Sequence, residues 1–285
     1  RVLEAFEGYE DLLLQESSGK ELQKIEFKDI KSKNLYYNES NEKDIERLES
    51  IMREENYLEL RKRLDEKGLP KGLTVLLYGA PGTGKTETVM QLARKTGRDV
   101  YHLNIEQIKS CWVGESEKNI KAIFKSYYAS KAKIKPILLF NEADAIIGIR
   151  KNGAQSAVDK MENSIQNIIL QEMENLDGIM IATTNLTQNL DKAFERRFLY
   201  KIKFEKPTQE ARSHIWHSMI PELNDMDVHT LASKYDFSGG QIENIARHYA
   251  IDSILHGQSE DALSLLIHHC DNERLDENTS RKIGF

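Results

Sequence analysis

The segment from Gly79 to Thr86, GAPGTGKT, constrains the fold of this chain more than any other feature. It fits the pattern G-x-x-x-x-G-K-[ST], in which successive backbone N–H groups surround a di- or triphosphate. Glycine permits positive φ angles here, and the helix that follows directs its positive dipole end at the phosphates. An apolar run, residues 74–78, precedes the segment, and a helical pattern, residues 87–95, follows it. The pattern therefore predicts a phosphate-binding loop between a strand and a helix.

The residue types within this loop indicate separate tasks. We expect the Lys85 ammonium group to reach the β- and γ-phosphate oxygens and the Thr86 hydroxyl group to ligate Mg²⁺. A plain glycine turn between strand and helix is the alternative. The predicted nucleotide-binding residues of the loop and the start of the helix are Gly79, Ala80, Pro81, Gly82, Thr83, Gly84, Lys85, Thr86 and Glu87. The sequence thus predicts a site for a nucleoside triphosphate and its metal ion.

Strand and helix patterns alternate along most of the chain. Short apolar runs predict strands, and amphipathic spacing at i, i+3 and i+4 predicts the helices between them. The predicted strands are residues 74–78, 100–105, 136–140, 178–183 and 200–204, and the predicted helices include residues 86–95, 117–130 and 158–176. Such alternation is typical of a three-layer α/β domain with a parallel sheet. Residues 136–140 are apolar apart from their first position, which indicates a strand buried on both faces.

Beyond Pro207 the strands stop and only helical patterns remain. These patterns cover residues 208–219, 228–235, 240–255 and 259–269, and a further helical region covers residues 41–67. We therefore expect three parts: an N-terminal linker or extension over residues 1–40, a P-loop α/β domain over residues 41–206, and a small all-α lid domain with a tail over residues 207–285.

A second motif ends the third predicted strand. Four apolar residues, Ile137–Phe140, lead into Asn141 and Glu142, which is the shape of a Walker B strand. At the carboxyl end of a parallel strand beside the P-loop, the first polar residue holds Mg²⁺ through Thr86 or through water. The second, Glu142, would orient and polarise the attacking water. A buried strand with an ordinary polar end is the alternative.

Together these motifs resemble those of the AAA family of the AAA+ ATPases. The resemblance continues, in the same order, through Thr183–Asn185, Asp191–Phe198 and Phe237–Ile242. It covers residues 35–266, and the nearest match is the soluble bacterial branch of the family. The resemblance implies an ATPase that binds ATP and Mg²⁺, with a P-loop domain and a helical lid, assembled as a homo-oligomeric ring that is usually hexameric.

The resemblance also assigns roles to single residues. Asn185 corresponds to the sensor 1 asparagine, which can hydrogen-bond both the γ-phosphate and the attacking water. Arg196 and Arg197 correspond to arginine fingers, whose always-charged guanidinium groups would reach the ATP of a neighbouring subunit. Gly240 lies in the segment where the helical lid meets the nucleotide. An exposed asparagine at a strand end and two surface arginines at a helix end are the plainer alternatives.

One position departs from the family pattern, because the resemblance places Asn141 where an aspartate is usual. Asparagine keeps a carbonyl acceptor for Thr86 or for a metal-bound water, but it loses a full charge near Mg²⁺. We expect nucleotide binding to persist and metal affinity and turnover to fall. Two functions therefore stay open: an ATP-driven remodeller or unfolder of proteins, and a nucleotide-gated assembly scaffold with weak hydrolysis.

An aromatic–aliphatic–glycine triplet, Trp112-Val113-Gly114, follows the second predicted strand. It resembles the first pore loop of the family, in which the flat aromatic side chain grips an extended polypeptide. The resemblance implies that Trp112 and Val113 contact a polypeptide substrate. A tryptophan buried in its own domain is the alternative. Residues 148–157 lie where a second pore loop would be.

Composition narrows the remaining choices. The 285 residues carry a net charge of −6, which speaks against a nucleic-acid partner. The sequence contains no apolar run that could span a membrane. Its two cysteines, Cys111 and Cys270, lie far apart in the sequence, which favours a cytoplasmic location.

His268, His269 and Cys270 are adjacent on a helical pattern and point apart, so we do not expect a metal site there. The chain begins at Arg1 rather than Met, and we expect a fragment whose missing N-terminal region selects the substrate.

Overall fold

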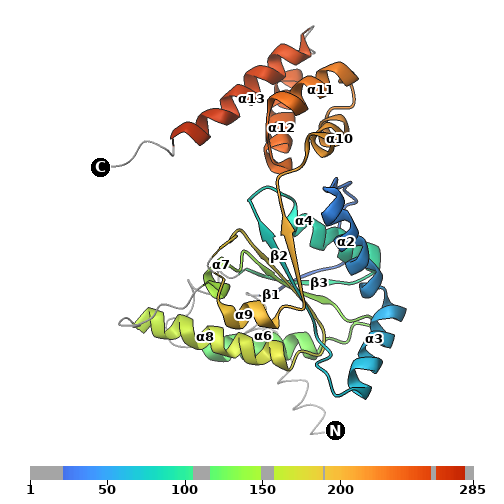
Figure 1. The fold of residues 1–285 in the computed structure, drawn as a ribbon, viewed down its shortest axis with the longest axis vertical. Coiled ribbons are helices and arrows are strands. Elements are labelled where there is room, and N and C mark those ends of the chain that lie inside the picture. The colour runs from blue at the N-terminus through green and yellow to red at the C-terminus, as the bar shows by residue number, and fades with distance from the viewer. Residues whose placement is uncertain (1–21, 105–115, 149–156, 189, 258–260, 280–285) are drawn as a thin grey trace. The chain divides into compact units, whose positions relative to one another are not determined.

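A computed structural model gives the fold of the chain and describes residues 22–104, 116–148, 157–188, 190–257 and 261–279. The chain divides into two compact units (Figure 1). Unit 1 comprises the described residues within 1–33, 43–79 and 85–203, and unit 2 comprises those within 34–42, 80–84 and 204–285. Each unit has its own hydrophobic core.

Unit 1 is built on a six-stranded sheet with the strand order β1-β3-β4-β5-β2-β6. The strands are β1 (Leu22–Ile25), β2 (Leu73–Gly79), β3 (Val100–Asn104), β4 (Ile137–Asn141), β5 (Ile179–Thr184) and β6 (Tyr200–Phe204). The four strands β3, β4, β5 and β2 are parallel neighbours in that order. Their carboxyl ends therefore share one edge of the sheet, which is where open α/β sheets place their ligands.

The predicted α/β class is confirmed, and the sheet is mostly parallel, with β1 as an antiparallel strand at one edge. β1 runs antiparallel to β3, with Leu22 opposite Leu103 and Ile25 opposite Val100. Sequence patterning missed β1 because its four residues, LQKI, carry two polar side chains and none of the four is fully buried. An edge strand pairs along one side, so it forms with little apolar surface of its own.

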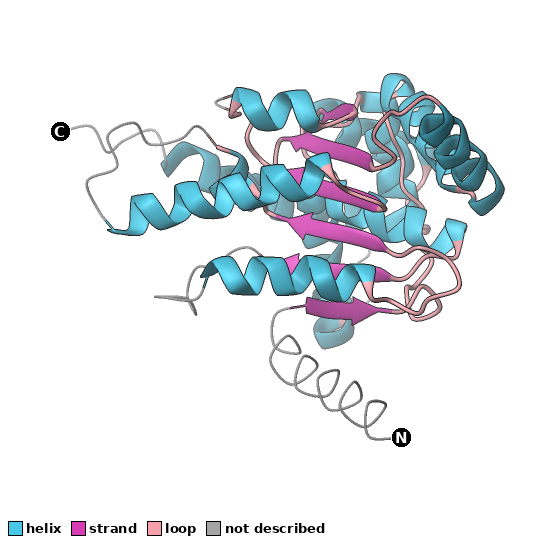
Figure 2. Cartoon of the chain, turned by 90° about the horizontal axis from the view of Figure 1, so that it is seen from below, coloured by secondary structure: helices cyan, strands magenta, loops and turns pink. Residues whose placement is uncertain are grey.

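Helices cover both faces of this sheet (Figures 1 and 2). On one side lie α2 (Glu39–Met52), α3 (Glu54–Glu66) and α4 (Lys85–Thr96). On the other side lie α6 (Ser116–Tyr128), the short α7 (Asp144–Ile147), α8 (Ala157–Glu174) and α9 (Lys192–Arg197). This arrangement is the three-layer α/β architecture that the alternating pattern predicts.

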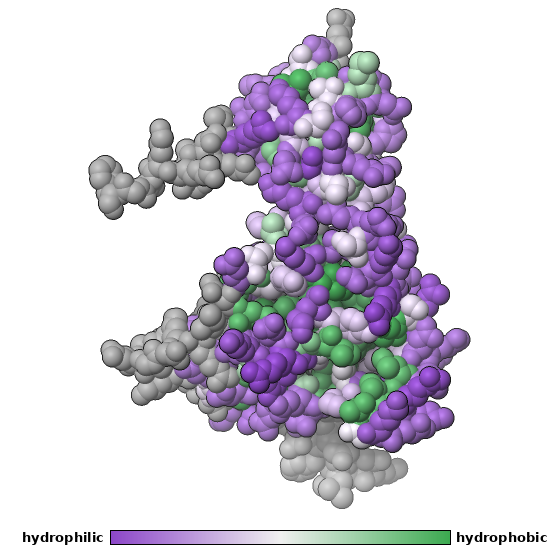
Figure 3. Space-filling model, viewed as in Figure 1, coloured by the Kyte–Doolittle hydropathy of each residue, from purple (hydrophilic) through white to green (hydrophobic). Residues whose placement is uncertain are grey.

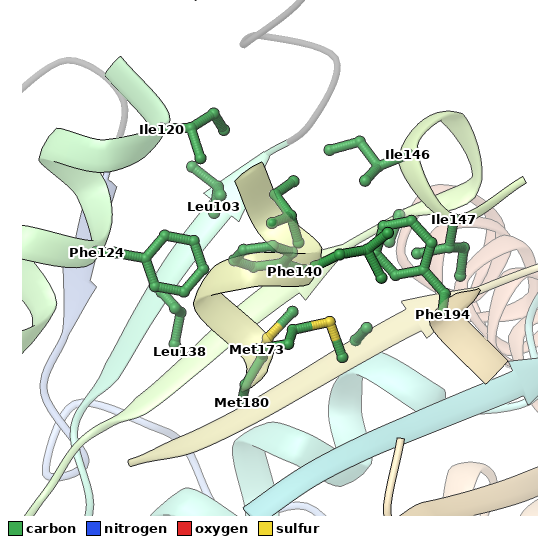
Figure 4. Close-up of a cluster of buried hydrophobic side chains, with 14 of the residues drawn as sticks. Leu103, Ile120, Phe124, Leu138, Phe140, Ile146, Ile147, Met173, Met180 and Phe194 are labelled. Carbon is green, nitrogen blue, oxygen red and sulfur yellow. The ribbon is translucent and has the colours of Figure 1, made fainter. Parts of the chain in front are cut away.

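A core cluster of unit 1 lies between the sheet and the helices α6 and α8 (Figure 4). Phe140 of β4 faces Phe124 of α6, with the two ring centroids 6.0 Å apart. All four apolar residues of β4, Ile137–Phe140, have 0% exposure, as expected for a strand covered on both faces. Burial of each such side chain contributes about 1.5–3 kcal/mol, so β4 is firmly anchored and its polar end is held in a defined place.

A fully buried arginine, Arg98, links the segments that precede β3 and β4 to the break between α2 and α3. Its Nε donates to Met52 O at 2.9 Å, its Nη1 to Lys135 O at 2.6 Å and its Nη2 to Glu54 Oε2 at 2.7 Å. The guanidinium carbon also lies 4.8 Å from the centre of the Tyr57 ring. The helical region predicted over residues 41–67 is two helices, α2 and α3, and Arg98 binds the backbone where the first one ends.

Unit 2 contains the helices α10 (Gln209–Met219), α11 (Asp225–Lys234), α12 (Gly239–His256) and α13 (Ala262–Thr279). The first three begin directly after Thr208, Asn224 and Ser238, whose side chains each accept a hydrogen bond from a backbone N–H three residues on. Their apolar faces enclose a core around Trp216 and Leu231. The helical patterns predicted beyond Pro207 are therefore all present, and the last helix runs ten residues further than its pattern.

The surface of the chain is largely polar. Hydrophilic residues cover most of the face that Figure 3 shows, in keeping with a sequence in which 30% of the residues are charged. In the part of the chain that the structure describes, no helix combines the length and the apolar character that crossing a bilayer requires.

Candidate nucleotide-binding site

The predicted phosphate-binding loop is a tight turn between β2 and α4. Gly82 and Gly84 have φ angles of 72° and 90°, in the left-handed region that glycine adopts without strain. Thr83 Oγ1 donates to Ala80 O at 2.8 Å and closes the turn. α4 then begins at Lys85, as the motif predicts. A glycine turn that opens a helix is the arrangement in which backbone N–H groups bind phosphate.

Lys85 is held by two oxygen atoms. Its Nζ donates to Gly79 O at 2.9 Å and to Asn185 Oδ1 at 3.0 Å, and the residue is 7% exposed. Burial lowers the pKa of Lys85 from 10.5 to about 8, while the carboxylate of Asp144 partly opposes this change. The group is therefore still charged at neutral pH, and the structure brings this lysine together with Asn185, which lies 100 residues further along the chain.

Thr86 is bonded to the end of β4. Its hydroxyl group donates to Asn141 Oδ1 at 2.7 Å. Because the hydroxyl proton points at Asn141, the lone pairs of Thr86 Oγ1 are free to ligate a cation. The same Asn141 oxygen also accepts from Thr183 Oγ1 at 2.8 Å. The residues therefore fit a Mg²⁺ ion bound by Thr86, with Asn141 orienting Thr86 rather than offering a charged ligand.

Asp144 organises the end of β5. Its Oδ1 accepts from the Asn185 backbone N–H at 2.9 Å, from the Leu186 N–H at 3.2 Å and from the Thr184 hydroxyl group. These bonds fix the backbone on which the Asn185 side chain is mounted. The sequence motifs assigned no role to Thr183 or to Asp144. The available signal was that polar residues cluster at the ends of two predicted strands.

Glu142, the predicted base, is exposed and follows β4 directly. Its backbone N–H donates to Thr183 Oγ1 at 3.2 Å, and its φ angle is 53°. Burial lowers the pKa of His102 of β3, and the carboxylate of Glu142 partly opposes that change. His102 therefore lies within electrostatic reach of Glu142. The Nε2 atom of His102 is buried and has no hydrogen-bond partner among the described residues. His102 is thus a neighbour of the candidate base that sequence reasoning did not identify.

In unit 2 the turn over residues 80–84 contacts the start of α12. Gly240 N donates to Gly82 O at 2.9 Å. A Cβ atom on Gly82 would lie 2.6 Å from Ser238 Oγ, and one on Gly240 would lie 3.1 Å from Gly82 Cα. The backbones approach this closely because both positions are glycine. Gly240, predicted to be near the nucleotide, is therefore bonded directly to the phosphate-binding turn.

The two predicted finger residues end α9 and differ from each other. Arg197 is bonded within the chain, since its Nη2 donates to Glu174 Oε1 and its Nη1 to Ala193 O at 3.1 Å. Arg196 is exposed. The geometry therefore distinguishes a partly buried arginine that is bonded within the chain from an exposed one, a difference that the two adjacent letters in the sequence do not reveal.

The remaining predictions concern Glu87, the two pore-loop segments and the histidines of α13. Glu87, in the first turn of α4, accepts a hydrogen bond from Gln91 Nε2 at 2.8 Å. Trp112, Val113 and most of the segment over residues 148–157 lie outside the described residues. In α13, His269 Nε2 lies 2.9 Å from Asp252 Oδ2 of α12. Among the described residues, no group of three or more histidine, cysteine or acidic side chains is arranged to hold a metal ion.

Comparison with known proteins agrees with this geometry. Residues 75–206 match the family model described as "ATPase family associated with various cellular activities (AAA)". The chain is 29% identical to Fidgetin-like protein 1 of Drosophila melanogaster, over 70% of this chain and 38% of that protein. It is 36% identical to the Proteasome-associated ATPase of Thermobifida fusca, over 54% of this chain and 29% of that protein. It is 31% identical to Protein SAV of Sulfolobus acidocaldarius, over 73% of this chain and 26% of that protein. The chain thus spans well under half the length of these curated relatives.

Proposed function

From the premise that residues 75–206 form an AAA ATPase domain, we propose that this protein binds ATP with Mg²⁺ and hydrolyses it to remodel or unfold a protein substrate. The observation that carries the ATPase activity is that the P-loop side chains bond directly to the ends of β4 and β5. Lys85 reaches Asn185, and Thr86 reaches Asn141. Groups that bind phosphate, metal and water are thereby gathered at one edge of the sheet.

Each of these groups has a defined task in hydrolysis. The Lys85 ammonium group exchanges its present oxygen partners for the β- and γ-phosphate oxygens, and this exchange releases the Asn185 side chain. Asn185 can then hydrogen-bond the γ-phosphate and the attacking water. The carboxylate of Glu142 accepts the proton of that water. Thr86 would hold Mg²⁺, and the ion would supply positive charge that neutralises the charge developing on the phosphate.

We further propose that the protein works as a homo-oligomeric ring, with six subunits as in the family pattern. An arginine finger must reach a phosphate on another subunit, so it has to be exposed. Arg196 meets this requirement better than Arg197, whose guanidinium group is already engaged by Glu174. The active site of each subunit would then be completed by its neighbour.

The substrate proposal rests on the pore-loop triplet and on the relatives. Trp112 and Val113 would grip an extended polypeptide, as the sequence resemblance implies. One relative carries the name Proteasome-associated ATPase. A polypeptide is therefore the class of substrate that we propose.

One observation favours a second candidate function, a nucleotide-gated assembly scaffold. The carbonyl oxygen of Asn141 already accepts two hydroxyl protons, and the residue has no charge to offer Mg²⁺. Weak metal binding would slow hydrolysis while leaving ATP binding intact. ATP would then control assembly rather than drive work.

The organisation of the chain follows from the same proposal. Residues 41–206 would be the ATPase domain and residues 207–285 the lid, while β1, within residues 1–40, adds a strand to the sheet of unit 1. Membership of the soluble bacterial branch remains a prediction, since the relatives include animal, archaeal and bacterial proteins. A cytoplasmic location also remains a prediction.

Phosphate release by the purified protein tests the two functions against each other. We expect hydrolysis that accelerates when an unfolded polypeptide is added, and a Glu142→Gln variant that binds ATP but does not turn over. Titration calorimetry with ATP gives the affinity of both proteins. Tight ATP binding without turnover by the unaltered protein would favour the scaffold, and absence of ATP binding would overturn both proposals.

A further inference from the structure

The backbone at Glu142 has an unusual conformation. Its φ angle of 53° makes it the single non-glycine residue with a positive φ among those that the structure describes. A side chain with a Cβ atom disfavours this region, and glutamate is not among the residues that adopt it most readily. Such conformations persist where the surrounding structure holds them, and they cluster at functional sites. Neighbouring groups must therefore hold Glu142 in this conformation.

Thr183 is the residue that bonds to this backbone. Its hydroxyl oxygen accepts from the Glu142 N–H at 3.2 Å, and its carbonyl oxygen accepts from the Ala143 N–H at 2.9 Å. Thr183 lies on β5 and is 2% exposed. The regular pairing of β4 with β5 ends where Phe140 lies opposite Ala182. Beyond that point Thr183 continues the connection between the two strands, partly through its side chain.

The direction of these bonds follows from the chemistry of the groups. A backbone N–H can only donate, so Thr183 Oγ1 is the acceptor for Glu142. The Thr183 hydroxyl proton is then directed to Asn141 Oδ1, 2.8 Å away. One buried hydroxyl group therefore bridges the two consecutive polar residues of the Walker B strand, holding the side chain of the first and the backbone of the second.

We propose that Thr183 is a positioning residue for hydrolysis: its hydroxyl group keeps Glu142 in the positive-φ conformation that aims the carboxylate at the attacking water. This inference rests on the proposed ATPase function. Thr183 touches neither nucleotide nor water in this scheme. It acts through the backbone of Glu142 and, secondarily, through Asn141 and the Thr86 hydroxyl group.

Thr183→Val tests the inference, because valine keeps the shape of threonine and removes the hydroxyl group. The first measurement is amide hydrogen exchange by NMR in the nucleotide-free protein. We expect exchange at Glu142 to accelerate roughly 5-fold to 50-fold, the range that follows from loss of one partly buried hydrogen bond. The amide of Ala143 is the internal control, since its partner is the Thr183 backbone carbonyl group, which the substitution keeps.

The second measurement is ATP turnover. Thr183→Val should lower kcat by a similar factor and leave KM and the affinity for ATP nearly unchanged, and Thr183→Ser should restore kcat. Thr96→Val is the matched control, because Thr96 is also buried and donates its hydroxyl proton to a carbonyl oxygen, Leu92 O at 2.7 Å. It should lower Tm as much as Thr183→Val does, without the loss of kcat.

The outcomes separate the inference from the proposed function. Unchanged exchange at Glu142, or full turnover by Thr183→Val, would overturn the inference while the unaltered protein still hydrolyses ATP. Loss of ATP affinity in proportion to a lowered Tm would also overturn it, since that pattern indicates a purely structural role. Failure of the unaltered protein to hydrolyse ATP would instead refute the proposed function, and the inference with it.

Discussion

Replacing Lys85 by methionine removes the ammonium group of the P-loop and keeps an unbranched side chain of similar length. We expect the Lys85→Met protein to be slightly more stable than the unaltered protein without nucleotide, and to gain nothing when ATP is added. The reason is that a lysine placed to bind phosphate is a partly desolvated charge while no phosphate is present. Site residues of this kind are retained for function at some cost in stability.

The structure sets the size of the effect. Lys85 is 7% exposed, and burial lowers its pKa from 10.5 to about 8. In a wholly buried group this fall would correspond to roughly 3 kcal/mol of destabilisation at neutral pH. Solvent near the exposed Asn185 reduces that figure by about half, and loss of the hydrogen bond to Gly79 O offsets about 1 kcal/mol more. The expected net gain is therefore about 0.5 kcal/mol, or roughly 1–2 °C in Tm.

The pH dependence has a definite sign. Because the folded-state pKa of Lys85 is depressed, the folded protein binds fewer protons than the unfolded chain between about pH 8 and pH 10.5. In that window the stability of the unaltered protein rises with pH through this group. The advantage of Lys85→Met should thus be greatest near pH 7 and shrink toward pH 10, while contributions from other groups cancel in the comparison.

Thermal unfolding followed by circular dichroism at pH 7 and at pH 10 measures both effects. With ATP and Mg²⁺ at a free ATP concentration of 100 times Kd, binding should add about 2.7 kcal/mol to the unaltered protein and nothing to the variant. Three results would refute the reasoning: a variant clearly less stable than the unaltered protein at pH 7, a difference that widens at pH 10, or an ATP-dependent rise in Tm equal in both proteins.

Other substitutions test the metal site, the buried Arg98 and the proposed ring. Asn141→Asp should lower the Mg²⁺ concentration needed for half-maximal hydrolysis, because it adds a charge beside the Thr86 hydroxyl group; an unchanged requirement in a metal titration would place residue 141 outside the influence of the metal. Arg98→Met should cost about 3 kcal/mol in urea-induced unfolding, since it breaks the ion pair of a buried arginine with the partly buried Glu54 and two bonds to carbonyl groups; a loss below about 1 kcal/mol would contradict this. Arg196→Ala should lower kcat by about 10³-fold with Tm unchanged, while Arg197→Ala should lower Tm. Turnover should partly return when Arg196→Ala subunits are mixed with Lys85→Ala subunits, and co-assembly without such recovery would argue against a shared site.

Much of the fold and the site follows from local signals in the sequence. The motif at Gly79–Thr86 predicts a turn and the start of a helix because glycine conformation, helix start and phosphate chemistry are properties of adjacent residues. The strand over Ile137–Phe140 follows from an unbroken apolar run, since only a strand covered on both faces buries every side chain. In unit 2, capping residues such as Ser238 stand immediately before the helices that they begin.

Tertiary structure alone decided which distant groups meet. Thr183 bonds to Asn141 and Glu142 across 41 or 42 positions of sequence, and this contact depends on the register of β4 against β5. Arg197 and Arg196 are adjacent letters, yet only the packing of α9 beside α8 engages one with Glu174 and leaves the other exposed. Periodicity and motifs predict the local structure that a residue forms with its near neighbours along the chain. A hydroxyl group or a guanidinium group is positioned by partners that folding brings beside it. The residue types of the candidate site could therefore be named from the sequence, and their positions relative to one another could not.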